Sequence, residues 1–330
     1  MTSNDNSGAV APAGSAPTGA RPAARGLTGV IPPVCTPLTP DFEVDTGSLA
    51  RLVDHLIEGG VDALFVLGST SEVAYLPDRH RRAVLETVVG HVAGQVPVLA
   101  GAIDMTTLRV LDHARVAAAA GADAIVATAP FYTRTHPVEI DRHFRAVAAG
   151  VGLPLYAYDL PVSVHSKLGA ELVLGLAADG VLAGLKDSSG DEGNLRGVIL
   201  GRRERSDLGG FSVLTGSELT VDSALWMGAD GVVPGLGNVD PHGYSRLYRL
   251  AAQGDWAGAR TEQERLLRLF ELITVGGTRM GISSSALGAF KAALYLRGVI
   301  AHPTTAVPQV PLDDDEIARV GKYLEAAGLR

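Results

Sequence analysis

Gly60-Val-Asp-Ala-Leu64 decides the fold of this chain, because the stretch recurs as Gly121-Ala-Asp-Ala-Ile125 and as Gly228-Ala-Asp-Gly-Val232. Each copy resembles a glycine that ends a helix, followed by the first residues of a buried strand. If the copies precede the second, fourth and eighth strands, one strand–helix unit takes about 27–30 residues, close to the size of a βαβ repeat. The stretch therefore predicts eight such units.

Working outward from these copies, short apolar runs alternate with amphipathic segments, as expected for parallel strands buried on both faces. The predicted strands are Val30–Cys35, Ala63–Leu67, Val98–Ala100, Ala124–Ala127, Leu155–Tyr158, Leu182–Leu185, Ser212–Leu214 and Gly231–Val233. Eight units predict an α/β fold, the closed (β/α)8 TIM barrel. An open doubly wound sheet is the alternative, but no Gly-x-Gly-x-x-Gly motif follows the first strand.

The chain of 330 residues divides into three parts. Residues 1–27 are rich in Ala, Gly, Pro and Ser and lack an apolar core, so we expect a disordered tail that cannot act as a secretory signal. Residues 28–242 are the predicted catalytic barrel. From residue 243 the strand signals stop, and residues 243–330 are predicted to form a C-terminal helical domain.

Composition argues against several kinds of partner. The net charge of −8 disfavours nucleic acid and anionic membrane surfaces, and no apolar run reaches the roughly 18 residues of a membrane span. A single cysteine, Cys35, excludes an internal disulfide, and the nine histidines show no metal-binding spacing. We therefore predict no metal or other cofactor, and a cytoplasmic location.

Lys186 is the sharpest candidate for chemistry, because it ends the apolar run Gly184-Leu185-Lys186. Burial there disfavours the charged ammonium, and a neutral amine can attack a ketone. Only four of the 28 basic residues are lysines (Lys167, Lys186, Lys291 and Lys322), so this chain uses arginine where charge alone is needed. A lysine paired structurally with a carboxylate is the alternative interpretation.

Other candidates follow the same rule, that a barrel carries its catalytic groups at the C-terminal ends of its strands. Tyr158 ends the strand before Lys186, and its phenol could transfer protons, although an interior tyrosine packed for stability fits as well. Ser69 and Thr70 follow the second strand and could bind a carboxylate, although such clusters are often plain turns. Further candidates for substrate binding at strand ends are Ser188, Gly216, Glu218 and Val233.

Taken together, these motifs resemble the dihydrodipicolinate synthase / N-acetylneuraminate lyase family of class I aldolases, from about Gly29 to the end of the chain. The resemblance is carried by Val34-Cys-Thr-Pro37, Gly68-Ser-Thr-Ser-Glu72, Pro130-Phe-Tyr132, Tyr158-Asp-Leu-Pro161, Gly184-Leu-Lys186-Asp-Ser-Ser189 and Gly216-Ser-Glu218. It implies a Schiff-base lyase that acts on a 2-oxo acid such as pyruvate and on an aldehyde.

The resemblance also implies roles for individual residues. Lys186 would form the Schiff base, Tyr158 would transfer protons, and Ser69 and Thr70 would bind the carboxylate of the 2-oxo acid, with one hydroxyl relaying protons to Tyr158. The backbone carbonyl of Val233 would face the lysine. Tyr132 would enter the site of a neighbouring subunit, which implies a homotetramer built as a dimer of dimers.

Two positions depart from the family pattern. Ser71 replaces the second glycine of the Gly-x-x-Gly-Glu loop, and because serine tolerates positive φ poorly, we expect a reshaped loop. Ser163 stands where dihydrodipicolinate synthases carry an arginine that grips the carboxylate of the aldehyde substrate. The loss of that bidentate clamp disfavours the lysine-biosynthesis reaction.

Three functions remain open from the sequence. The first is an aldolase or hydratase-aldolase, with a sugar-acid substrate whose hydroxyls Glu218 and Asp191 could bind, although either carboxylate could equally be a solvated loop residue. The second is dihydrodipicolinate synthase (4-hydroxy-tetrahydrodipicolinate synthase) itself. The third is a non-catalytic relative that binds a 2-oxo acid, against which the Tyr158–Lys186 pair argues.

Overall fold

The computed structural model describes residues 24–330 and confirms the (β/α)8 barrel with a C-terminal helical extension. All eight predicted strands are present, and they run parallel in the order β1-β8-β7-β6-β5-β4-β3-β2. A parallel bridge from Pro33 to Phe65 joins the β1 segment to β2, so the sheet is closed rather than doubly wound. The strands are β1 (Gly29–Val30), β2 (Leu64–Val66), β3 (Val98–Gly101), β4 (Ala124–Thr128), β5 (Leu155–Asp159), β6 (Gly184–Asp187), β7 (Ser212–Thr215) and β8 (Gly231–Val232).

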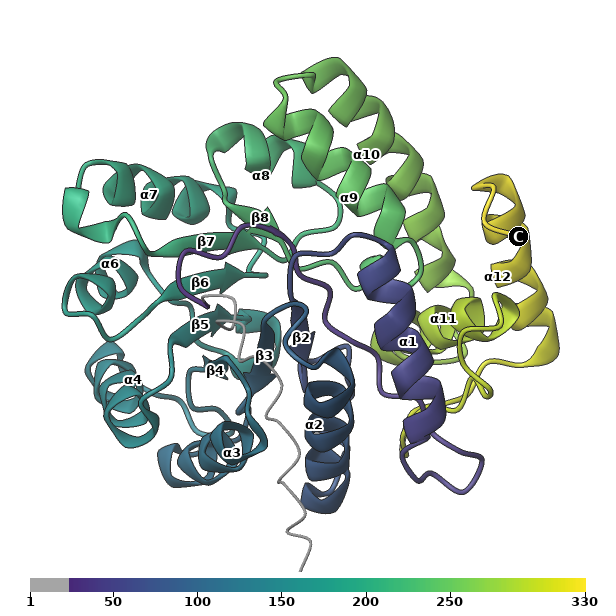
Figure 1. Ribbon diagram of the computed structural model, residues 1–330, viewed down its shortest axis with the longest axis horizontal. Coiled ribbons are helices and arrows are strands. Elements are labelled where there is room, and N and C mark those ends of the chain that lie inside the picture. Colours follow the sequence, from purple (N-terminus) through teal and green to yellow (C-terminus); the bar gives the residue numbers. More distant parts are fainter. Residues whose placement is uncertain (1–23) are drawn as a thin grey trace, which may run out of the picture.

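Helices surround the strands, and α10, α11 and α12 extend the molecule on one side (Figure 1). The helices around the barrel are α1 (Thr46–Glu58), α2 (Asp78–Val92), α3 (Thr107–Ala120), α4 (Pro137–Val151), α5 (Pro161–Val164), α6 (Ala170–Ala178), α7 (Glu192–Arg203), α8 (Val221–Met227) and α9 (Pro241–Ala252). The extension comprises α10 (Trp256–Phe270), α11 (Ile282–Leu296) and α12 (Asp314–Ala326). Short 3-10 turns are η1 (Ser206–Leu208), η2 (Leu236–Asn238) and η3 (Glu271–Thr274).

The recurring motif couples neighbouring strands. Its glycines all take positive φ after a helix, at +76°, +92° and +106° for Gly60, Gly121 and Gly228. Each motif aspartate accepts a hydrogen bond from a backbone N–H near the start of the preceding strand: Asp62 from Val30 at 2.8 Å, Asp123 from Val98 at 2.9 Å and Asp230 from Val213 at 2.7 Å. The aspartate thus ties each helix-to-strand turn to the strand beside it.

Two predicted boundaries fall inside packed structure. Ala24 and Leu27, which we assigned to the tail, are buried with the residues that fill the barrel, and the Tyr156 hydroxyl donates to the Ala24 carbonyl at 3.0 Å. The rest of the predicted tail, residues 1–23, lies outside the described residues. The boundary expected between residues 242 and 243 falls within α9, the helix that follows the eighth strand.

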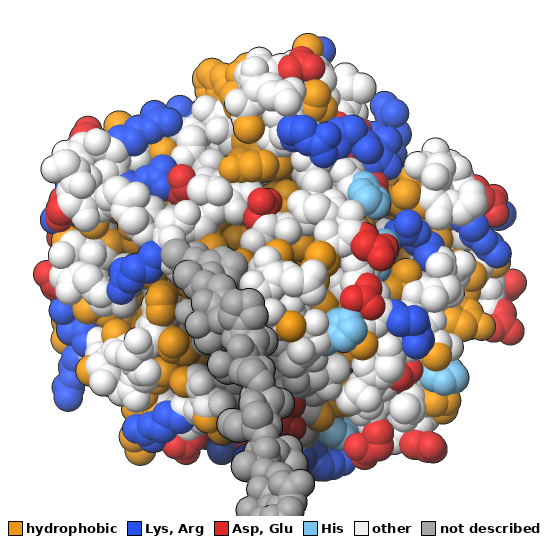
Figure 2. Space-filling model, viewed as in Figure 1, with side chains coloured by type: hydrophobic (Ala, Val, Ile, Leu, Met, Phe, Trp, Pro, Cys, Tyr) orange, Lys and Arg blue, Asp and Glu red, His pale blue; other side chains and the backbone are white. Residues whose placement is uncertain are grey.

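On the face shown in Figure 2, acidic and basic side chains are interspersed around the rim, over the helices. No helix within residues 24–330 is both long enough and apolar enough to cross a membrane.

We predict that removing residues 1–27 destabilises the protein more than removing residues 1–23. The longer truncation uncovers the interior at Ala24 and Leu27 and leaves the buried Tyr156 hydroxyl without its acceptor, a loss worth about 1–3 kcal/mol. Urea denaturation of the two truncated proteins measures the difference. Equal midpoints would show that residues 24–27 contribute nothing to the barrel.

Candidate active site

Lys186 and Tyr158 lie side by side at the C-terminal ends of two paired strands. β5 and β6 pair in the register Tyr158–Lys186, as their positions in the sequence predict. Lys186 is 6% exposed, and its Nζ lies 3.9 Å from the centre of the Tyr158 ring and 5.1 Å from that of Phe65. An ammonium over an aromatic face is attracted by the ring quadrupole, so the rings hold the amine in one place.

The electrostatics around Tyr158 suit proton transfer. Burial raises the pKa of Tyr158, but the charge of Lys186 and hydrogen bonds with Ser69, Lys186 and Ser188 lower it by more. The net effect is a phenol whose pKa lies below its ordinary value. The Tyr158 hydroxyl is 3.4 Å from Ser69 Oγ, which connects the tyrosine to the loop after β2.

The loop after β2 does not bear the strain that we expected at Ser71. Ser71 does not take positive φ, whereas Glu72 does, at +62°. The buried Ser71 Oγ donates to the Val34 carbonyl at 2.5 Å and accepts from Gly68 N–H at 3.2 Å. Serine therefore adds hydrogen bonds that hold the loop, and the positive φ expected at Ser71 lies at Glu72 instead.

Glu72 forms a buried ion pair with Lys291 of α11. Both side chains are fully enclosed, at 1% and 0% exposure. Glu72 Oε1 also accepts from Ala306 N–H at 2.6 Å, and Lys291 Nζ donates to the Thr304 carbonyl at 2.7 Å. The predicted carboxylate loop is thus fastened to the C-terminal extension.

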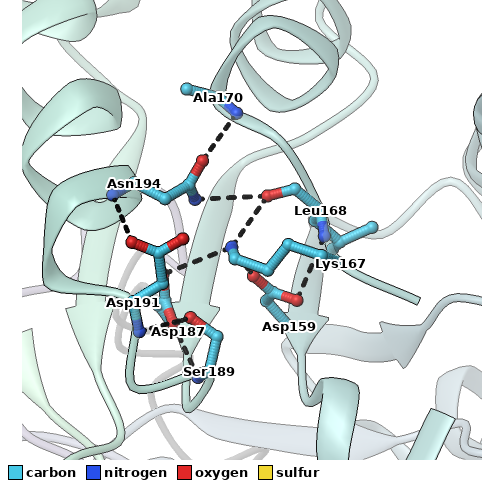
Figure 3. A network of polar contacts seen from close by, with 8 residues as sticks. All are labelled: Asp159, Lys167, Leu168, Ala170, Asp187, Ser189, Asp191 and Asn194. Carbon is cyan, nitrogen blue, oxygen red and sulfur yellow. Dashed lines mark hydrogen bonds and ion pairs between the residues drawn. The ribbon is translucent and has the colours of Figure 1, made fainter. Parts of the chain in front are cut away.

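A second network fixes the loops that follow Tyr158 and Lys186 (Figure 3). The next residue on each strand is an aspartate, and the ammonium of Lys167 pairs with Asp159 and lies 4.0 Å from Asp187. Asp187 in turn accepts from the N–H and the hydroxyl of Ser189, at 2.8 and 2.6 Å. Asp191, a candidate for binding substrate hydroxyls, caps the N-terminus of α7 through Asn194 N–H at 2.9 Å.

A cavity of about 420 Å³ opens at this end of the barrel, and it reaches the catalytic candidates through Ser69, which lines the cavity and contacts Tyr158. Its volume lies within the range of ligand sites, roughly 300–1,000 Å³. Loops of the barrel and one face of α11 line it, with the residues Ser69, Thr70, Glu72, Val73, Ala74, Tyr75, Ile103, Thr128, Phe131, Leu160, Ser163, Val164, Glu218, Phe270, Ser283, Ala286, Leu287 and Phe290. Within residues 24–330, no three His, Cys, Asp or Glu side chains lie close enough together to hold a metal ion.

The structure places the remaining candidates around Lys186. A side chain on Gly216 would put its Cβ 1.9 Å from Ser188 Oγ and 3.2 Å from Lys186 Cε, so a larger residue would displace the Ser188 hydroxyl and crowd Lys186. Val233 is buried beside Lys186 in the barrel interior. Glu218 lines the cavity and accepts from Leu236 N–H at 2.5 Å. Burial raises the pKa of Glu218 to about 7, although that backbone hydrogen bond and the charge of Lys186 oppose the rise.

Tyr132 lies apart from this group. It is 88% exposed and takes positive φ, +75°, which is rare for a bulky residue. Within one subunit it is not among the residues that line the cavity.

Sequence reasoning missed the contribution of the C-terminal extension. Phe270, Leu287 and Phe290 come from helices that follow no strand, so the rule of strand ends could not find them. Lys291 did carry a signal, because it is one of four lysines and stands in the apolar run Ala289–Ala293.

Comparison with known proteins supports the family and the fold. A sequence model of the Dihydrodipicolinate synthetase family matches residues 26–327. An uncharacterized DapA-like lyase of Halobacterium salinarum is 34% identical over 92% of this chain and 95% of its own length. The 4-hydroxy-tetrahydrodipicolinate synthase of Porphyromonas gingivalis is 32% identical over 91% and 98%. The crystal structure of YagE from E. coli K12, in complex with pyruvate, superposes with a TM-score of 0.85 at 30% identity, over 92% of this chain and 99% of YagE.

Fold, site and relatives together define the protein as a lyase built on a (β/α)8 barrel. The chain belongs to the dihydrodipicolinate synthetase family.

We predict that Lys291→Met destabilises the protein by about 3–5 kcal/mol, because it leaves the buried Glu72 carboxylate without its charged partner. Adding Glu72→Gln removes the stranded charge and keeps an oxygen that can accept from Ala306, so the double variant should regain part of the loss. Urea denaturation measures both. A double variant no more stable than Lys291→Met would contradict an ion pair at this position.

Glu218 predicts a pH dependence of stability. Its folded pKa of about 7 lies above the ordinary value of 4.5, so between these values the folded state binds more protons than the unfolded state. Stability therefore falls as the pH rises from about 5 to 7. We expect Glu218→Gln to abolish this part of the slope in urea midpoints measured from pH 5 to 8. Parallel profiles for the two proteins would rule out the raised pKa.

Proposed function

We propose that this protein is a class I aldolase or hydratase-aldolase in which Lys186 forms a Schiff base with pyruvate or another 2-oxo acid. The observation that carries the proposal is the buried Lys186 amine against the ring of Tyr158 at the end of β6. The crystal structure of the relative YagE in complex with pyruvate supports the choice of a 2-oxo acid.

Each residue of the proposed site has its own role in the reaction. Ser69 and Thr70 bind the carboxylate, and the Lys186 amine attacks the ketone carbon, with loss of water to give an imine. The imine draws electrons from the adjacent methyl group, which loses a proton to form an enamine. The enamine carbon bonds to the aldehyde carbon while the aldehyde oxygen gains a proton, and water then releases the 4-hydroxy-2-oxo acid from Lys186. Tyr158, with its lowered pKa, transfers the protons.

Dihydrodipicolinate synthase is the alternative function, because several relatives carry the name 4-hydroxy-tetrahydrodipicolinate synthase. Ser163 argues against it. This residue lines the cavity at the position where the family resemblance expects an arginine, so no guanidinium is available there for a second carboxylate.

We further propose a homotetramer in which Tyr132 enters the site of a neighbouring subunit. The exposure of Tyr132 and its positive φ support the proposal, because a strained conformation with no partner in its own subunit suits a residue that acts at an interface. Sedimentation of the wild-type protein tests the assembly, and a monomer would contradict it.

Trapping tests the Schiff base directly. Borohydride with pyruvate should inactivate the protein and attach one reduced adduct per chain, on a peptide that contains Lys186. Lys186→Arg keeps the charge but cannot form the imine, so it should show no adduct. Tyr158→Phe is the matched control, which should still be trapped but lose about 100-fold or more in turnover. An adduct on another lysine, or full activity in Lys186→Arg, would refute the proposal.

A further inference from the structure

The cavity wall beyond Ser69 and Thr70 is apolar. Its surface comes largely from aromatic and aliphatic side chains, among which Phe270 and Phe290 lie with ring centres 6.4 Å apart and tilted by 37°. Phe131, Leu160, Val164 and Leu287 add to the same wall. A polar or charged substituent placed against this part of the wall would lose its water and gain few partners.

The charges of the lining residues also disfavour an anionic substituent. Among the described residues that line the cavity there is no lysine, arginine or histidine. Neither carboxyl group of the lining supplies a positive charge, since Glu72 is already paired with Lys291 and Glu218 is neutral or negative depending on its proton. The neutral hydroxyl of Ser69 lies 3.4 Å from that of Tyr158, where the 2-oxo acid is proposed to bind. An aldehyde with its own carboxylate therefore finds no counter-charge in this lining.

One polar atom of the lining lacks a partner. Thr128 is buried at the end of β4, in register with Tyr158, and its Oγ1 makes no hydrogen bond in the described part of the chain. A buried hydroxyl without a partner is costly, and rotation of the Thr128 side chain toward the cavity would let a substrate oxygen satisfy it. Its place beside Tyr158 suits the aldehyde oxygen, the atom that must gain a proton when the new bond forms.

We propose that the second substrate of this site is an uncharged aldehyde with an aromatic or branched or linear alkyl group, in place of a carboxylated or polyhydroxylated aldehyde. The proposal rests on the proposed aldolase function. The enamine carbon of the pyruvate adduct bonds to the aldehyde carbon, the aldehyde oxygen gains a proton next to Tyr158 and Thr128, and hydrolysis yields a 4-hydroxy-2-oxo acid whose apolar group lies against Phe270 and Phe290.

Paired aldehydes test the proposal on the full-length protein. Butanal and succinic semialdehyde have the same number of carbons and differ in a terminal carboxylate, while benzaldehyde and glyceraldehyde compare an aromatic with a hydroxylated group. With pyruvate, kcat/KM for butanal and benzaldehyde should exceed that for succinic semialdehyde and glyceraldehyde by about 10-fold or more. Equal or reversed preference, or no turnover of the apolar pair, overturns the proposal.

Variants at Ser163 give a second measurement. Ser163→Arg places a cation at the cavity wall and should shift the ratio of kcat/KM toward succinic semialdehyde by about 10-fold, whereas Ser163→Met, of similar length and no charge, should not. An unchanged ratio in Ser163→Arg counts against the proposal. Borohydride trapping with pyruvate separates the two levels, because a protein that is trapped but prefers charged aldehydes refutes only the substrate class, while one that is never trapped refutes the aldolase function.

Discussion

The parallel register of β5 and β6 brings together the phenol of Tyr158 and the amine of Lys186, although 27 residues separate them in the sequence. Parallel strands end at one edge of the barrel, so a residue at the end of each strand must lie beside its neighbour. The following residues, Asp159 and Asp187, belong to the opposite face of the pleat and both lie near Lys167 (Figure 3). The same register therefore sets the Tyr158–Lys186 contact on one face and the contacts of both aspartates with Lys167 on the other, and a slip of β6 by one residue would turn Lys186 away from Tyr158 and lose both.

The extension beyond the barrel is part of the site rather than an appendage. The Glu72–Lys291 pair and the hydrogen bond from Ala306 to Glu72 join the loop after β2 to α11 and to the segment after it. A buried pair of this kind gives little net stability, because desolvation offsets the attraction, but losing one partner is costly. The Glu72–Lys291 pair instead fixes positions. Through it, α11 holds the loop that carries Ser69 and Thr70, and the same helix brings Leu287 and Phe290 to the cavity.

The sequence predicted all eight strands and the neighbouring positions of Tyr158 and Lys186, because burial on both faces and strand order along the chain are local signals. It could not predict which helix face closes the mouth of the barrel, since α11 reaches the cavity through tertiary packing. Lysines are few in this chain, which singles out Lys291 as well as Lys186. Only Lys186 stands at the end of a predicted strand, and that position distinguishes the two. The backbone at Ser71 was predicted wrongly. The replacement of a glycine suggested a positive φ at Ser71, whereas the residue with positive φ is the next one, Glu72.

The choice of second substrate depends on which charged groups the side chains of the site can pair with. Lys186 is committed to the rings of Tyr158 and Phe65, and Lys291 to Glu72, so neither cation is available to a second anionic group. With Ser163 in the wall, most of the surface left for a second substrate is apolar, and the hydroxyl of Thr128 is unpartnered within residues 24–330. Apolar contact discriminates weakly between sizes but strongly against an unpaired charge, because the charge must be stripped of water. In the proposed reaction, a single change of side chain at residue 163 would therefore separate two substrate classes, and the chemistry proposed for Lys186 would stay the same while the partner of the enamine changes.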